Sequence, residues 1–154
     1  MLTGQRYERA GYYFLLVYAL FYMGNAVFGT FLPIYLDHVG FSSSAVGSIL
    51  ALGPFVTIIA QPFWGTAADR AGTKNNVLKF LILGSAISVV LFRFSSNYFY
   101  LIAVMAIVTF FQCSISPLTD AITLEYADKT KWKFSSIRMS GTIGYAFMSI
   151  LAGI

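Results

Sequence analysis

Long uncharged segments recur along this chain and are separated by short charged ones. The first runs from about residue 11 to 36 and the second from about 44 to 68. About 20 apolar residues in a helix cross the ~30 Å hydrocarbon core of a bilayer, so each segment is long enough to span a membrane. Three further segments, at about 77–94, 98–126 and 134–154, are also mainly apolar, with isolated charges within them. The sequence therefore predicts an all-α fold, a polytopic bundle of five transmembrane helices.

Composition supports a membrane protein and argues against several other classes. Hydrophobic residues make up 58% of the chain and charged residues 10%, whereas a typical soluble domain is about 25% charged. A single cysteine, Cys113, excludes a disulfide within the chain, and a single histidine, His38, argues against a metal site. No histidine, cysteine or paired carboxylates converge as in a catalytic centre. We expect no enzymatic activity, no cofactor, no metal and no nucleic-acid partner.

The basic residues indicate how the helices are oriented. Nine of the ten Lys and Arg residues fall in the leader before residue 11, in the connection near 69–79, or near 127–138. Only Arg93 lies at the other ends of the predicted helices. Cytoplasmic loops carry an excess of Lys and Arg. The sequence therefore predicts a protein of the cell membrane with a cytoplasmic amino terminus and the lipid bilayer as a partner.

Two opposite charges lie inside the fourth and fifth apolar segments. Asp120 lies nine positions before Lys129 in the charged connection, and Arg138 lies nine positions after it. If two helices reverse there, both charges lie roughly 10–13 Å into the membrane, at ~1.5 Å per residue. Such charges are costly when they face lipid and usually mark functional sites. We therefore predict that Asp120 and Arg138 face each other across an interior polar site; a structural ion pair is the alternative.

Other polar residues follow single helical faces in three of the segments. Spacings of three, four or seven residues place side chains on one face of a helix. These polar faces suggest a shared, water-filled cavity, although Ser and Thr that bond their own backbone and Tyr that anchors at the interface are the alternative. The residues that we predict to contact a small-molecule solute there, besides Asp120 and Arg138, are Tyr22, Asn25, Gln112 and Tyr145.

The connection between the second and third segments resembles the signature of the major facilitator superfamily, in which a Gly precedes an Asp-Arg pair and a second Gly. The signature positions here are Gly65, Asp69, Arg70, Gly72 and Lys74. Segments 31–36 (FLPIYL), 61–65 (QPFWG) and 138–145 (RMSGTIGY) are similar to the lactose permease and phenylpropionate permease branch of that superfamily. The resemblance covers essentially the whole chain.

This resemblance implies a twelve-helix transporter that works by alternating access around a midplane site. Residues 1–154 would then be a partial amino-terminal transmembrane domain, partnered by carboxy-terminal helices outside this sequence. It implies that Asp120 and Arg138 bind substrate hydroxyls and that Tyr145 stacks on a sugar ring. It also implies that the loop with Asp69 gates the cytoplasmic side. Proton symport of a sugar is the leading expectation, and an aromatic acid or a nucleoside is an alternative solute.

Two other interpretations stay open at this point. The chain could be a small membrane scaffold whose buried ion pair is purely structural. It could also be a truncated, non-functional transporter fragment. The residues do not decide which solute is moved, which ion is coupled, or the oligomeric state.

Overall fold

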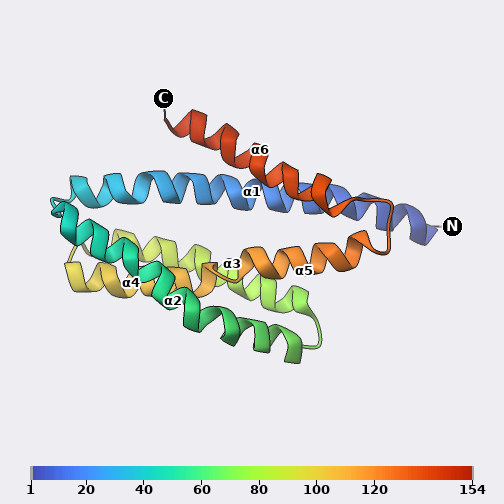
Figure 1. Cartoon of the computed structure of the whole chain (residues 1–154), viewed down its shortest axis with the longest axis horizontal. Helices are drawn as coiled ribbons and strands as arrows, with labels where there is room; N and C mark the ends of the chain where they lie inside the picture. Colours follow the sequence, from blue (N-terminus) through green and yellow to red (C-terminus); the bar gives the residue numbers. More distant parts are fainter. Residues whose placement is uncertain (1, 154) are drawn as a thin grey trace. The chain divides into compact units, whose positions relative to one another are not determined.

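The computed structural model describes residues 2–153, with side chains from residue 10 onward. The regular elements within that range are helices, which confirms the predicted all-α fold. In chain order they are α1 (Leu2–His38), α2 (Ser43–Arg70), α3 (Lys74–Val90), the 3-10 turn η1 (Leu91–Arg93), α4 (Tyr98–Gln112), α5 (Ile115–Ala127) and α6 (Phe134–Ala152) (Figure 1).

Four helical segments in the described range are long and apolar enough to cross a membrane. They are Ala10–His38, Ser43–Arg70, Lys74–Arg93 and Tyr98–Ala127. Helix α6, which the sequence predicts as a fifth span, is not in this group. Its Arg138 and its several Ser, Thr and Gly residues lower its hydropathy below that of these four segments. By length and composition, the chain is a multi-pass membrane protein.

Local side-chain chemistry sets where several helices begin and end. The hydroxyl of Ser42 accepts a hydrogen bond from the Ala45 backbone N–H and caps α2. The side-chain oxygen Oδ1 of Asn97 caps α4 in the same way, accepting from the Phe99 N–H at 3.0 Å. The turn between α1 and α2 contains Gly40 with φ +97°, a left-handed conformation that favours glycine.

Two predicted boundaries differ from the structure. The leader before residue 11, expected as a short polar lead, is helical from Leu2 onward. The charged turn expected over residues 69–74 is shorter, because Arg70 ends α2 and Lys74 begins α3. Only residues 71–73 therefore connect the two helices. Helical geometry at residues 69 and 74 gives their side chains defined directions.

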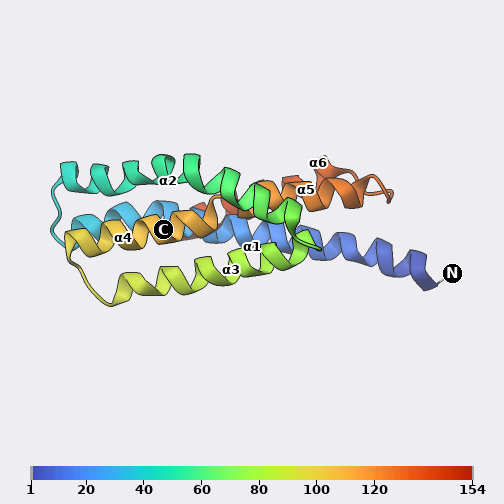
Figure 2. The ribbon, with the colours of Figure 1, turned by 90° about the horizontal axis from the view of Figure 1, so that it is seen from below.

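The chain divides into two compact units, each described by itself. Unit 1 comprises Met1–Tyr35 and Thr123–Ile154, and unit 2 comprises Leu36–Ile122. In unit 2, α4 packs against both α2 and α3, and Figure 2 shows α4 between them. The contact is largely aromatic: the Trp64 ring of α2 lies 5.3 Å from Phe110 and 5.9 Å from Phe111, centroid to centroid. Edge-to-face and tilted contacts of this kind are favourable for aromatic rings.

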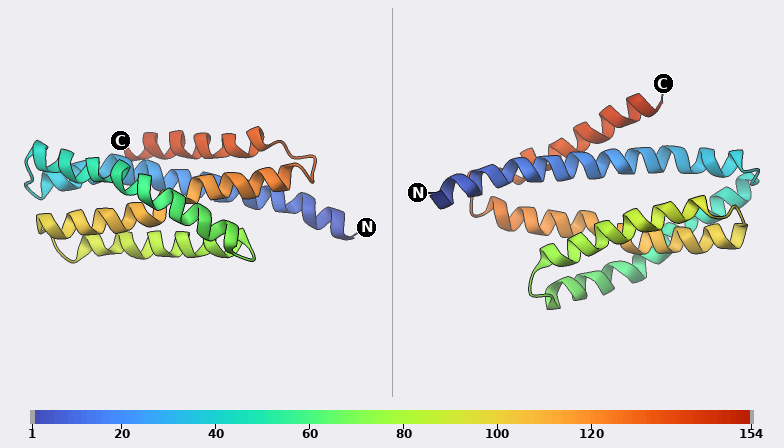
Figure 3. Two further views of the ribbon diagram at one scale, coloured as in Figure 1. Left: turned by 60° about the horizontal axis from the view of Figure 1, so that its bottom comes forward. Right: turned by 180° about the vertical axis from the view of Figure 1, so that it is seen from behind.

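In unit 1, helix α6 lies against α1, as the views in Figures 1 and 3 show. Tyr18, Tyr126 and Ile137 form the buried core of this unit. The helices approach closely at two glycines of α6. A Cβ atom added to Gly144 would lie 2.7 Å from the backbone oxygen of Ala19, and one added to Gly141 would lie 2.7 Å from the Tyr22 ring. Small residues permit this backbone approach, which is how helices associate in membranes.

Candidate functional site

The predicted fourth span is interrupted in its middle. The sequence predicts one helix over residues 98–126 that bends at Pro117. The structure instead ends α4 at Gln112 and begins α5 at Ile115, so the interruption precedes the proline. Pro117 has no N–H to bond the Cys113 carbonyl four residues earlier, and its ring clashes with that carbonyl in a regular helix. The proline therefore explains a break at residues 113–114.

Side chains of α2 supply hydrogen bonds at this break. The Trp64 indole N–H donates to the Phe110 carbonyl oxygen at 2.8 Å. The Gln61 side-chain amide donates to the Cys113 carbonyl oxygen at 3.5 Å, the outer limit of a hydrogen bond. Backbone groups freed by a proline in a membrane helix must find such partners, because lipid offers none. Two side chains of α2 thus donate hydrogen bonds to carbonyls at the α4–α5 break.

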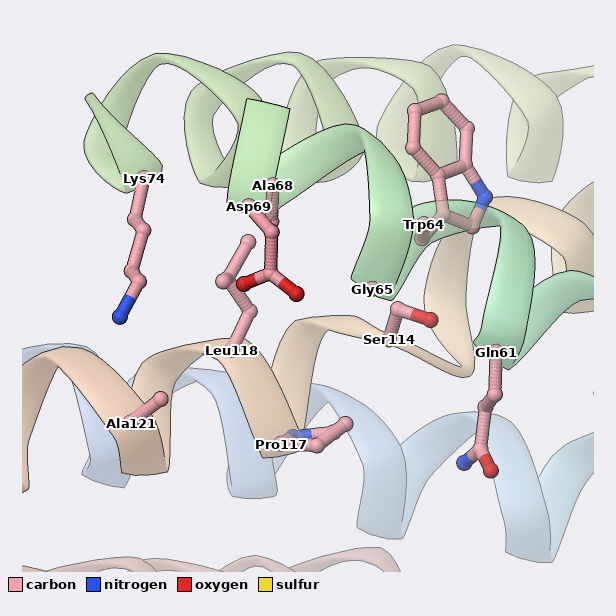
Figure 4. Close-up of a pocket in the computed structure, with 10 residues that line it drawn as sticks. All are labelled: Gln61, Trp64, Gly65, Ala68, Asp69, Lys74, Ser114, Pro117, Leu118 and Ala121. Atoms are coloured by element: carbon pink, nitrogen blue, oxygen red, sulfur yellow. The ribbon is translucent and has the colours of Figure 1, made fainter. Parts of the chain in front are cut away.

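A cavity of about 250 Å³ lies between α2, the start of α3 and the α4–α5 break. Five of its residues recur along one face of α2 at intervals of one, three or four positions. The cavity is lined by Gln61, Trp64, Gly65, Ala68, Asp69, Lys74, Ser114, Pro117, Leu118 and Ala121. In Figure 4, the Asp69 carboxylate and the Lys74 ammonium both extend from the α2–α3 end toward α5. The cavity therefore has one acidic and one basic side chain at one end, and the rest of its lining is mainly apolar.

The predicted site residues of unit 2 fall into two groups. Three signature residues, Gly65, Asp69 and Lys74, line the cavity, while Arg70 and Gly72 are exposed and do not. Gln112 is the last residue of α4 and is half-buried. Asp120 is half-buried on α5, between Leu118 and Ala121 of the cavity wall. The structure therefore brings the signature turn against the same helix that carries Asp120.

The predicted site residues of unit 1 lie on the α1–α6 pair. Tyr22 packs beside Gly141, one turn after Arg138 in α6. Asn25 lies one turn along α1 and donates its side-chain amide to the Phe21 carbonyl at 2.9 Å. Arg138 is exposed, with its guanidinium carbon 5.9 Å from the centre of the Phe134 ring. Tyr145 is 45% exposed on α6.

Asp120 belongs to unit 2 and Arg138 to unit 1. Their predicted pairing therefore stays a prediction, as does the shared polar cavity of the three helical faces. Within each unit the grouping is clear: the signature turn meets α5 in unit 2, and Tyr22 meets α6 in unit 1.

Comparison with known proteins identifies the family. The profile described as MFS_1 like family matches residues 12–154, nearly the whole chain. The chain belongs to the MFS_1 like family of the major facilitator superfamily. It is similar to a maltose permease of Geobacillus stearothermophilus, with 31% identity over 142 residues, which is 92% of this chain and 34% of the permease. No solved structure matches it.

The chain is also similar to two other bacterial proteins. An uncharacterized transporter, YwbF of Bacillus subtilis, is 33% identical over 68% of this chain and 26% of its own length. A multidrug resistance protein, MdtG of Yersinia enterocolitica, is 26% identical over 80% of this chain and 31% of its own length. The chain thus spans about a third of the length of the curated relatives it matches.

Sequence reasoning missed the roles of three residues in this superfamily chain. Gln61 and Trp64 belong to the segment QPFWG that carries part of the family resemblance, yet nothing in it indicates hydrogen bonds to the break. Ser114 is 5% exposed and lines the cavity. The available signal was the spacing: Gln61, Trp64 and Ala68 share a helical face, and a proline follows in a neighbouring apolar segment.

Proposed function

We propose that this chain is the amino-terminal part of a secondary active transporter that moves a small solute across the cell membrane by alternating access. A sugar is the first candidate solute and protons are the proposed coupling ion. The observation that carries this proposal is the similarity to a maltose permease over 92% of the chain. The chain corresponds to about a third of such a protein, so the remaining helices of the transporter belong to the proposal as well.

The proposed binding site uses charges on two successive helices. Arg138 offers a planar fork of donors and Asp120 offers two acceptor oxygens, which together can hold neighbouring hydroxyl groups of a sugar. Tyr145, two turns after Arg138 on α6, offers a ring for stacking against a sugar face. Tyr22, Asn25 and Gln112 complete the set as polar lining. This arrangement follows the lactose permease and phenylpropionate permease branch, which remains our narrower assignment.

The proposed orientation has the amino terminus and the α2–α3 turn in the cytoplasm. It rests on the excess of Lys and Arg at those positions. Asp69 and Lys74 then lie at the cytoplasmic end of a cavity that borders α5. We assign them, with Gly65, Arg70 and Gly72, to a gate whose contacts favour one of two alternating conformations.

An uptake panel tests the proposal directly. The full-length protein is placed in liposomes with an inward proton gradient, and uptake of radiolabelled maltose, a nucleoside and an aromatic acid is measured. We expect maltose to accumulate and a protonophore to abolish the accumulation. Uptake of the nucleoside or the aromatic acid alone would replace the sugar while preserving the transporter. A protein that moves none of these solutes, and no drug, would favour the scaffold.

Substituting the gate aspartate should slow transport without weakening solute binding. We expect Asp69→Asn to lower the maximal uptake rate about 10-fold with KM unchanged, because losing roughly 1.4 kcal/mol from one conformation shifts a two-state equilibrium tenfold. Asp128→Asn makes the same chemical change at an exposed position between α5 and α6 and serves as the matched control. Initial rates over a range of solute concentrations separate the two constants; a change in KM alone would contradict the gating role.

A further inference from the structure

The α4–α5 break lies close to the proposed substrate-binding carboxylate. Asp120 is three residues beyond Pro117, within the first two turns of α5. A helix that restarts after a break takes its direction from whatever fixes its first turn. The Thr119 hydroxyl bonds back to the Ile115 carbonyl at 2.7 Å, so this first turn is itself tightly closed. The position of the Asp120 carboxylate therefore depends on how the break is held.

Two side chains of α2 bond carbonyls at the break. Trp64 is 8% exposed and bonds the Phe110 carbonyl before the break at 2.8 Å. Gln61, one turn earlier, reaches the Cys113 carbonyl in the break itself. The cavity wall continues across the break onto Leu118 and Ala121, which flank Asp120 in sequence. One helical face thus bonds the end of α4 and the break, and it lines the same cavity as the arm that carries the carboxylate.

We propose that Trp64 and Gln61 are positioning residues for Asp120: their side-chain N–H groups hold the carbonyls at the α4–α5 break and so fix the direction of the α5 arm. This inference rests on the proposed function, because it assigns Asp120 a role in solute binding. It adds two residues of α2 that contact no solute and act through the backbone of a neighbouring helix.

Cys113 lies in the break and is the only cysteine of this sequence, so its reactivity can report how often the break opens. Its thiol lies 3.6 Å from both the Phe110 carbonyl oxygen and the Ser114 hydroxyl. In the full-length protein, alkylation of the Cys113 peptide by N-ethylmaleimide, followed by mass spectrometry, measures how often the break opens. We expect Trp64→Phe, which keeps a ring and removes the donor, to raise the alkylation rate about 10-fold.

A different aromatic residue of α2 provides the matched control. Phe55 is 68% exposed, and Phe55→Leu leaves both donors in place. We expect this variant to alkylate at the original rate. Gln61→Leu is a milder second variant, in case Trp64→Phe fails to fold, and it should raise the rate about 3-fold. Equal rates in Trp64→Phe, Gln61→Leu and the original protein would overturn the proposal.

A double-mutant cycle separates positioning from general loosening. Pro117→Ala restores an N–H that can bond the Cys113 carbonyl within the helix, so Gln61→Leu should no longer change the alkylation rate in that background. A merely structural role of Gln61 would give the same change in both backgrounds, which would contradict the proposal. This readout does not depend on transport.

Transport then tests the link to Asp120. We expect Trp64→Phe to raise the KM for radiolabelled maltose about 10-fold with a small change in the maximal rate, and Phe55→Leu to change neither. Faster alkylation with an unchanged KM would overturn the positioning role. Normal uptake by Asp120→Asn would instead overturn the proposed function, and the alkylation rates would still decide whether α2 holds the break.

Discussion

Replacing Asp120 with Asn in the full-length protein should lower solute uptake at low concentration about 100-fold. The amide keeps the size of the side chain and removes its charge. Hydrogen bonds to charged groups contribute about 1.5–3 kcal/mol, and about 2.7 kcal/mol corresponds to a factor of 100. Arg138→Gln should have a similar effect, because the guanidinium fork is lost. Initial uptake rates, normalised to the amount of protein in the membrane, measure both variants.

The control and the contrary outcomes distinguish a binding role from a structural one. Asp128→Asn makes the same change at an exposed loop residue and should leave uptake unaltered. Normal uptake by Asp120→Asn would contradict the binding role. Exchanging the two charges, with Arg at 120 and Asp at 138, should not restore uptake, since a bound solute would meet its donors and acceptors reversed. Full restoration would indicate a purely structural ion pair.

The second large effect concerns the α1–α6 contact, where Gly144→Ala should destabilise the protein strongly. The added Cβ would lie 2.7 Å from the Ala19 backbone oxygen and 3.0 Å from its Cα, and backbone atoms cannot turn away as a side chain can. Overpacking of this kind costs about 1–3 kcal/mol. We expect the melting temperature of the detergent-purified full-length protein to fall by roughly 1–4 °C.

Two other glycines of the same unit make this test specific. Gly141→Ala meets only the Tyr22 ring, which can rotate, so its effect should be smaller. Gly24→Ala meets nothing within 4 Å and should leave the melting temperature unchanged or slightly higher, because Ala favours a helix. Equal melting temperatures for Gly144→Ala and Gly24→Ala would contradict the close approach of α6 to α1.

Much of the fold follows from the sequence because lipid imposes a simple rule. A helix satisfies its own backbone, so long uncharged segments can only be helices, and charged connections such as 127–133 end them. The helix caps also follow from residue type, as Ser42 and Asn97 show. The family signature around Asp69 can also be recognised in the sequence, because a reversal between two helices requires glycines and charged residues at fixed spacings.

What sequence reasoning could not supply depends on pairs of distant residues. Pro117 predicts a bend, but the position of the break and its donors on α2 depend on packing that no single segment encodes. Gly24 and Gly144 are the same residue type in helices, yet only Gly144 lies against a neighbouring backbone. The pairing of Asp120 with Arg138 is of this long-range kind and remains a prediction.

The interrupted helix also has a consequence for biosynthesis. Its arms contain 15 and 13 residues, about 22 and 20 Å at ~1.5 Å per residue, so neither alone crosses a ~30 Å core. They must enter the bilayer as one unit, carrying the proline with them. Because translation runs from the amino terminus, the indole and amide donors of α2 are made some 50 residues before the carbonyls they bond. Helix α2 is therefore synthesised before the interrupted α4–α5 helix whose carbonyls it bonds.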